Sequence, residues 1–219
     1  MVTAHGLAPK IRNAVSRTRR LVGELLYERR YHVHTSGNLI LADHDAENIC
    51  YTPVNWRQLR RVLPPGSVTE QDVFIDLGSG KGRAVLEAAA RYPFRKVIGV
   101  ELLPELNEIA RQNLAGTTRR LRCEDVELVT ADLREYRIPD DATVFFTNNA
   151  VRGTVFAAVL RGISASLARN PRPARFAYGN PLDDAAVLST GAWRKVRTVV
   201  PRRSHWPYGA TCVYESVSQ

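Results

Sequence analysis

Short apolar runs recur along the chain, and four of them end in a polar residue. The runs 73–75, 96–100, 126–131 and 142–147 are followed by Asp76, Glu101, Asp132 and Asn148. Continuous apolar runs of this length are typical of strands buried on both faces of a parallel sheet. Because parallel strands end at the same edge of a sheet, these polar residues are expected to line one ligand crevice.

Segments with helical spacing lie before and between these strands. They cover residues 11–30, 54–63, 103–114 and 152–167, whereas 31–51 has the composition of a loop. After a short fifth strand at 175–178, the runs 196–200 and 212–217 have no helix between them that is long enough for a parallel crossover. The pattern predicts an α/β fold closed by an antiparallel hairpin, with the first helix packed on or over the sheet.

Three glycines, Gly78, Gly80 and Gly82, follow the first strand at alternate positions and lead into a helix. A residue without a Cβ lets the backbone approach a ligand closely, and a helix N-terminus offers unpaired N–H groups. A dinucleotide turn, G-x-G-x-x-G, would place its third glycine at position 83, which is Arg83. The turn therefore indicates a different nucleotide-like ligand, the alternative being a turn that is merely tight. Lys81 and Arg83 are expected to be solvated.

The spacing acid-x-G-x-G-x-G from Asp76 to Gly82 resembles motif I of the Rossmann-like (class I) S-adenosylmethionine (SAM) methyltransferases. The resemblance covers about residues 70–217 and implies SAM as cofactor, bound to a seven-stranded sheet with helices on both faces. It also implies that Glu101 accepts the ribose hydroxyls and that Asp132 faces the adenine amino group. The cofactor-binding residues expected from it are Tyr51, Asp76, Gly78, Ser79, Gly80, Gly82, Glu101, Leu102, Asp132, Leu133 and Asn148.

Two of these acids also have a local explanation that stays open. Glu101 precedes the 103–114 helix, and a carboxylate is favoured near a helix N-terminus. Asp132 could likewise cap the turn before Arg134.

The residues after the fourth strand usually face the methyl group in this class. They are Asn148, Asn149, Ala150 and Val151 here, without the Pro-Pro-aromatic sequence of relatives that methylate nucleic-acid bases. An amide carbonyl accepts an N–H hydrogen bond without adding charge, and an amine becomes nucleophilic by losing a proton. Asn148 and Asn149 are therefore candidate catalytic residues for N-methylation, while a helix cap is the alternative for Asn149.

The same segment, VFFTNNAV, resembles the Asn-Asn motif of the histone lysine methyltransferases that lack a SET domain. In those enzymes an aromatic residue follows the pair, and Ala150 replaces it here. The chain also resembles bacterial stand-alone methyltransferases that combine a Tyr-x-Pro segment, Tyr51 to Pro53 here, with the sequence DLGSGKGR.

Residues 27–35, YERRYHVHT, precede the core and carry further candidates. Such a loop could close over the methyl group, with Tyr31 and His34 as catalytic residues, because histidine titrates near neutral pH. A surface or packing cluster is the alternative. His32 and His34 would bind a metal only with ligands that the sequence does not indicate, so no metal is expected. Trp206 and Tyr208 are candidates for the lining of a substrate pocket.

With 219 residues, the chain is long enough for one well-buried domain. We expect a helical lid segment at 1–69 and a SAM-binding core at 70–219. No run is long and apolar enough for a membrane span, and the first residues lack a signal-peptide core, which favours a cytoplasmic protein. Three scattered cysteines, Cys50, Cys123 and Cys212, suggest neither a disulfide framework nor a paired-cysteine zinc site.

The formal net charge is +9, from 31 Lys and Arg against 22 Asp and Glu. Nearly all the basic residues are arginine and stand in short clusters, as a GC-rich bacterial genome would produce. We interpret the clusters as solvated faces, so nucleic acid is an unlikely but not excluded partner. The sequence predicts no oligomeric state.

Taken together, the residues predict a SAM-dependent methyltransferase that N-methylates a small molecule or peptide of bacterial specialised metabolism. A protein lysine N-methyltransferase is the first alternative, and an O-methyltransferase with a histidine base is the second. Outside catalysis, the alternatives are a SAM-binding module and a basic RNA-binding protein.

Overall fold

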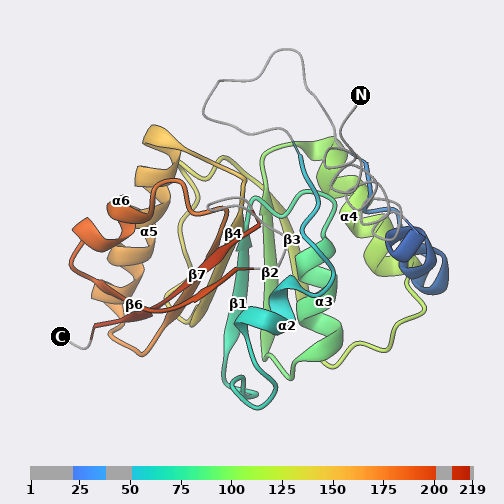
Figure 1. Ribbon diagram of the computed structural model, residues 1–219, viewed down its shortest axis with the longest axis horizontal. Coiled ribbons are helices and arrows are strands. Elements are labelled where there is room, and N and C mark those ends of the chain that lie inside the picture. The colour runs from blue at the N-terminus through green and yellow to red at the C-terminus, as the bar shows by residue number, and fades with distance from the viewer. Residues whose placement is uncertain (1–21, 38–50, 201–208, 218–219) are drawn as a thin grey trace, which may run out of the picture.

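The computed structural model describes residues 22–37, 51–200 and 209–217. Seven strands form one sheet within these residues (Figure 1). They are β1 (Val73–Leu77), β2 (Lys96–Glu101), β3 (Val126–Thr130), β4 (Val144–Asn148), β5 (Arg175–Gly179), β6 (Trp193–Val199) and β7 (Thr211–Ser216). Their order is β3-β2-β1-β4-β5-β7-β6. Strands β1 to β5 are parallel, whereas β7 is antiparallel to β5 and β6. The predicted Rossmann-like α/β sheet and its closing hairpin are confirmed.

Helices cover both faces of this sheet (Figure 1). The described helices are α2 (Gln58–Val62), α3 (Arg83–Arg91), α4 (Pro104–Gly116), α5 (Gly153–Arg169) and α6 (Asp184–Ser189), and residues 22–31 are also helical. Within the described residues, no helix combines the length and apolar character that a membrane span requires.

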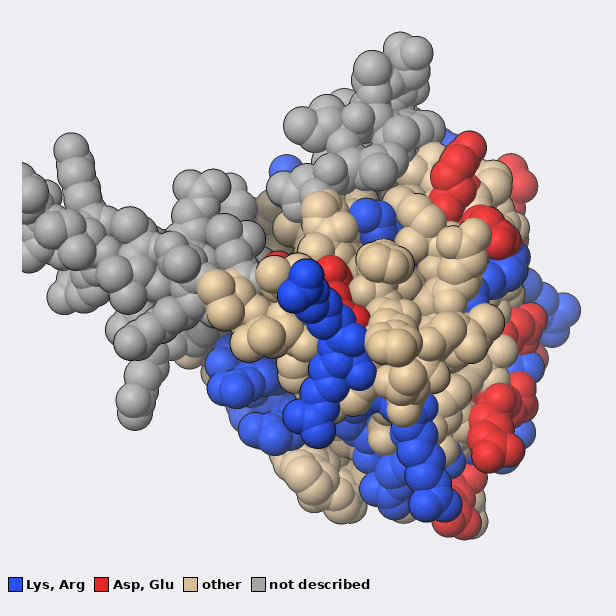
Figure 2. Space-filling model, turned by 90° about the vertical axis from the view of Figure 1, so that its right-hand side faces the viewer, with Lys and Arg blue, Asp and Glu red and all other residues tan. Residues whose placement is uncertain are grey.

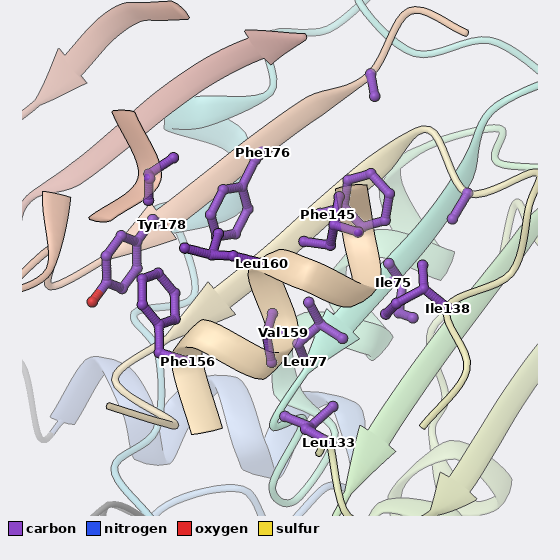
Figure 3. Close-up of a cluster of buried hydrophobic side chains, with 14 of the residues drawn as sticks. Ile75, Leu77, Leu133, Ile138, Phe145, Phe156, Val159, Leu160, Phe176 and Tyr178 are labelled. Atoms are coloured by element: carbon purple, nitrogen blue, oxygen red, sulfur yellow. The ribbon is translucent and has the colours of Figure 1, made fainter. Parts of the chain in front are cut away.

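One face of the sheet is buried under α5 and α6. Figure 3 shows the side chains of α5 among those of β1, β4 and β5, including Phe156, Leu160, Phe145 and Phe176. Phe156 stacks on Tyr178 with ring centroids 4.7 Å apart. Each such side chain contributes about 1.5–3 kcal/mol when it is fully buried. This aromatic layer fixes β4 and β5, whose ends carry candidate site residues.

The opposite face is covered by α2, α3 and α4. Leu59 and Val62 of α2 share a buried cluster with Phe74 of β1 and Val85 of α3. The N-terminal residues 54–68 thus pack into the same core as the sheet, which holds Gln58, the first residue of α2, next to the end of β4.

Two helix predictions need correction, and one helix was not predicted. The 54–63 helix is confined to α2, because residues 52–55 have no regular secondary structure and 56–57 form a turn, with Val54 and Trp56 buried. Helix 22–31 contacts α3 and the end of α4 rather than the sheet: Arg91 donates to Tyr27 at 2.8 Å, and Thr118 donates to the Arg30 carbonyl at 3.0 Å. The short helix α6 was not predicted, since six residues carry too little periodicity.

Candidate active site

The glycine turn after β1 has the conformation that only glycine adopts easily. Gly78, Gly80 and Gly82 have φ values of +85°, +54° and +78°. A Cβ on Gly78 would lie 2.2 Å from the Cβ of Ala150, and one on Gly80 would lie 2.3 Å from Cε2 of Tyr51. The turn is therefore covered by Ala150, which follows β4, and by Tyr51 of the N-terminal segment, so three parts of the chain meet at this point.

Two buried carboxyl groups flank this turn. Glu101 accepts hydrogen bonds from the Gly80 N–H at 2.7 Å and from the Leu103 N–H at 3.1 Å. Burial raises the pKa of Glu101. Burial, with the charge of Glu101 as a second cause, raises the pKa of Asp76 to about 8. The pair therefore favours a ligand with a cationic group or with hydroxyls that can donate to both carboxyls.

The local explanation for Glu101 has a direct contact, while its role as acceptor of the ribose hydroxyls stays a prediction. Its Oε1 supports the start of α4 through Leu103, while its Oε2 faces the glycine turn. Leu102 and Leu103 are half-buried beside it. Ser79 is buried, and its Oγ has no hydrogen-bond partner among the described residues. That hydroxyl lies against Gly99 of β2, 3.0 Å from where a Cβ would stand on this glycine.

Asp132 lies beyond the end of β3 and is engaged locally. Its carboxylate accepts two hydrogen bonds from Nε of Arg134, at 3.1 and 2.9 Å, and one from Nη2 at 2.6 Å. The hydrogen bonds from Arg134 lower the pKa of Asp132. The neighbouring Leu133 is buried in the core. The local capping explanation for Asp132 therefore has direct contacts, while its adenine contact stays a prediction.

The prediction that Lys81 and Arg83 are solvated is wrong. Arg83 is 1% exposed, and its guanidinium lies 4.7 Å from the centre of the Trp56 ring. Its Nε donates to Oγ1 of Thr35 at 2.7 Å. Its Nη2 pairs with Oε1 of Glu28 at 3.4 Å. A buried guanidinium needs an anionic partner and several acceptors, and the N-terminal segment supplies both.

Lys81 and Tyr51 also join the N-terminal segment to the glycine turn. Nζ of Lys81 donates to the carbonyl of Ser36 at 2.8 Å. The Tyr51 hydroxyl donates to the Thr35 carbonyl at 2.6 Å. Burial raises the pKa of that phenol. Residues 33–37 are thereby fixed to the glycine turn, and Tyr51 is brought over Gly80 as a lid residue would be.

Asn148 and Asn149 have different environments. Asn148 lies at the end of β4 with its side chain over β5: a Cβ on Gly179 would lie 2.2 Å from Oδ1 of Asn148. That oxygen accepts a hydrogen bond from Nε2 of Gln58 at 2.9 Å. Asn149 has a φ of +54°, and Arg152, without a side-chain cap, is the N-cap of α5. Asn149 therefore does not cap this helix.

The structure does not bring Tyr31 and His34 to the Asn pair. Tyr31 packs against Tyr27, with ring centroids 5.0 Å apart, and its carbonyl accepts from the Thr118 N–H at 3.3 Å. This contact lies beyond the end of α4, at the far end of that helix from Glu101. The backbone N–H of His34 donates to Oδ1 of Asn113 at 2.6 Å, and its side chain is exposed.

Other sequence candidates gave mixed results. Trp206, Tyr208 and Cys50 lie outside the described residues. Cys123 and Cys212 are buried free thiols. No group of three or more potential metal ligands occurs in the part of the chain that the structure describes. Sequence reasoning missed Gln58, Thr35 and the buried role of Arg83, because each acts through partners that are distant in sequence.

The fold and the glycine turn are those of a class I SAM-dependent methyltransferase, whose cofactor is SAM. Two observations fit this ligand: a positive-φ glycine turn, and the acid pair Asp76 and Glu101. Asp76 and Glu101 suit a molecule that carries both cationic groups and a vicinal diol.

A family model described as histone methylation protein DOT1 matches residues 30–161, which is more than half of the chain. The chain belongs to this family. It is 29% identical over 104 residues to a protein-lysine N-methyltransferase of Saccharolobus islandicus, covering 47% of this chain and 63% of that protein. It is 31% identical over 116 residues to the H3 lysine-79 specific histone-lysine N-methyltransferase of Drosophila melanogaster, covering 48% of this chain and 6% of that protein. The matches thus span less than two thirds of either relative.

Solved structures show the same fold. A SAM-dependent methyltransferase from Methanosarcina mazei superposes with a TM-score of 0.56 at 9% identity, covering 69% of this chain and 95% of that one. TrmN from Thermus thermophilus gives a TM-score of 0.54 at 19% identity, covering 74% of this chain and 48% of that one.

Proposed function

We propose that the chain transfers a methyl group from SAM to the side-chain amine of a lysine in a protein or peptide. The observation that carries the proposal is the pair of uncharged amides at the end of β4, Asn148 and Asn149. The next residue, Ala150, covers the glycine turn, which supports a place for the pair beside the bound cofactor. Family membership and two relatives named as lysine methyltransferases support the choice of lysine.

For methyl transfer, the protein mainly has to position the acceptor amine and keep it deprotonated. SAM, when bound, supplies an electrophilic methyl group. The chain must hold the amine in line with that group and exclude water. An amide oxygen accepts an N–H hydrogen bond, but it does not hold the ammonium form as a carboxylate would. Neutral amides at this edge therefore favour the deprotonated, nucleophilic amine.

Two other methyl acceptors have less support. A small-molecule amine would use the same amides, but nothing in the family match favours it over lysine. An oxygen acceptor needs a general base, and no contact among the described residues joins His34 to Asn148 or Asn149. The buried free thiols of Cys123 and Cys212 suit the reducing cytoplasm in which we place the reaction.

The test is methyl transfer from labelled SAM to four acceptors. They are a lysine-rich peptide, the same peptide with arginine for lysine, free lysine with spermidine, and a peptide with only hydroxyl nucleophiles. We expect label on the first peptide alone, with a 14 Da increment mapped to lysine. Asn148→Ala should impair turnover more than SAM binding, whereas Asn170→Ala, at an exposed asparagine, should change neither. Label on the free amines or on the hydroxyl peptide instead would overturn the proposal.

A further inference from the structure

Three residues stand side by side at the carboxyl edge of the sheet. Asn148 of β4 is paired in register with Gly179 of β5, and Gly179 is paired with Thr211 of β7. The middle residue has no side chain, so a notch opens between the polar side chains of Asn148 and Thr211.

The amide of Gln58 fills this notch. Its Nε2 donates to Oδ1 of Asn148 at 2.9 Å and to Oγ1 of Thr211 at 3.0 Å. A Cβ on Gly179 would lie 2.8 Å from that Nε2 and 2.2 Å from Oδ1 of Asn148. Both N–H groups of the Gln58 amide are therefore used, and glycine at 179 is required for them to reach their acceptors.

Gln58 itself is held firmly. It is the first residue of α2, whose Leu59 and Val62 are 2% exposed in the core beneath the sheet. Thr211, the acceptor on the other side, is 1% exposed. The terminal torsion of an asparagine side chain is otherwise broad, so a free Asn148 amide would sample several orientations.

We propose that Gln58 is a positioning residue, which fixes the Asn148 amide so that its remaining lone pair and its N–H groups have set directions. This inference rests on the proposed function, in which Asn148 receives the acceptor amine. Positioning of this kind acts on turnover, because small misplacements of a reacting group slow transfer without weakening cofactor binding.

The activity test compares Gln58→Leu, which keeps the size but cannot donate, and Gly179→Ala, which fills the notch. Gly179 is outside the positive-φ region, so alanine adds no backbone strain there. We expect each variant to lower kcat/KM for the lysine peptide by about tenfold to a hundredfold while SAM affinity stays unchanged. The double variant Gln58→Leu/Asn148→Ala should be no worse than Asn148→Ala alone. The matched control is Gln71→Leu, an exposed glutamine at the opposite edge of the sheet.

A second measurement does not need methyl transfer. The side-chain amide signals of Asn148, assigned in a ¹H–¹⁵N spectrum by comparison with Asn148→Ala, should shift in Gln58→Leu and stay in place in Gln71→Leu. An unmoved Asn148 signal, or normal kcat/KM in Gln58→Leu with an active wild type, overturns the inference. If the wild type methylates no amine while the Asn148 signal shifts as expected, the proposed function fails and the link between Gln58 and Asn148 stands.

Discussion

Asp76 is a carboxyl group whose ionisation the fold opposes. Burial and the nearby charge of Glu101 raise its pKa to about 8, so the folded protein binds a proton that the unfolded chain releases near pH 4. The stability that this proton contributes is complete below pH 4 and is lost as the pH rises through 8. We predict that the unfolding temperature of the free protein falls with pH in this window, and that Asp76→Asn lacks this part of the slope.

A cationic ligand favours the ionised carboxyl of Asp76, so its binding should oppose the loss of stability with rising pH. S-adenosylhomocysteine, which keeps the amino group, should therefore raise the unfolding temperature of the wild type more at pH 8 than at pH 6. This difference between pH 8 and pH 6 should be much smaller in Asp76→Asn. Parallel slopes for the two proteins across pH 5–9 would show that Asp76 does not titrate in this range.

Gly80 is a second residue whose substitution should change both stability and SAM binding. Its φ is +54°, and an added Cβ would lie 2.3 Å from the Tyr51 ring. We predict that Gly80→Ala costs about 1–3 kcal/mol of unfolding free energy and weakens SAM binding at least tenfold, because Tyr51 must move. Denaturant unfolding and a thermal-shift titration measure the two effects.

The matched control for this substitution is Gly66→Ala. Gly66 also has a positive φ, +84°, but nothing lies within 4 Å of an added Cβ. It should lose stability through backbone strain alone and keep full SAM affinity. Equal effects of the two substitutions on affinity would remove the Tyr51 contact from the account.

At the scale of elements, the N-terminal segment depends on the buried Arg83. This guanidinium binds Thr35, the Val54 carbonyl and Glu28, and it stacks on Trp56. Removing one partner of a buried ion pair leaves the other uncompensated, which costs about 3–5 kcal/mol. We predict this loss for Arg83→Met, with rapid proteolysis within residues 22–57, and little change for Arg95→Met at an exposed position. Cleavage of both variants at the same rate would contradict the account.

Strands β1, β2 and β4 could be predicted from the sequence because each is a largely apolar run with a polar end, whereas the predicted run 196–200 misses residues 193–195 of β6, where Arg194 and Lys195 are exposed. The hydrophobic pattern gives periodicity but not partners, so the insertion of β7 between β5 and β6 could not be derived in detail. Arg83 was misjudged for the same reason. Its hydrogen-bond partner Thr35 and its ion-pair partner Glu28 are 48 and 55 residues away, and a local pattern contains no sign of them.

The same distinction holds for the site: residues in short motifs could be predicted, and long-range contacts could not. The glycine turn, Asp76 and Glu101 belong to short motifs whose spacing encodes their geometry. Gln58 is 90 residues from Asn148 and 153 from Thr211, and it became visible only when the sheet register was known. Tyr31 and His34 were selected for their chemistry alone, and the fold places their contacts elsewhere.

At the scale of the whole molecule, the positive charge is unevenly spread. Figure 2 shows Lys and Arg side chains gathered over the lower half of one face. Arg30 and Arg119 lie 5.7 and 4.8 Å from the centre of the Tyr31 ring, and Arg122 donates to the Arg91 carbonyl at 3.2 Å. Arg91 and Arg119 both pair with the buried Glu87, which neutralises part of this charge.

We predict only non-specific nucleic-acid binding by this protein. The dissociation constant for a short duplex should be about 10⁻⁴ to 10⁻⁶ M at physiological salt and should weaken steeply as salt rises. A fluorescence anisotropy titration at three salt concentrations measures this. Nanomolar binding that persists at high salt would favour the RNA-binding alternative.

The central claim is that the glycine turn and the acids at the carboxyl edge of the sheet bind SAM, and a calorimetric titration with S-adenosylhomocysteine tests it most directly. We predict saturable one-site binding, no binding of NAD, and a large loss of affinity in Glu101→Ala but not in Glu108→Ala, at an exposed glutamate of α4. Binding of NAD in place of S-adenosylhomocysteine, or full affinity in Glu101→Ala, would contradict the account.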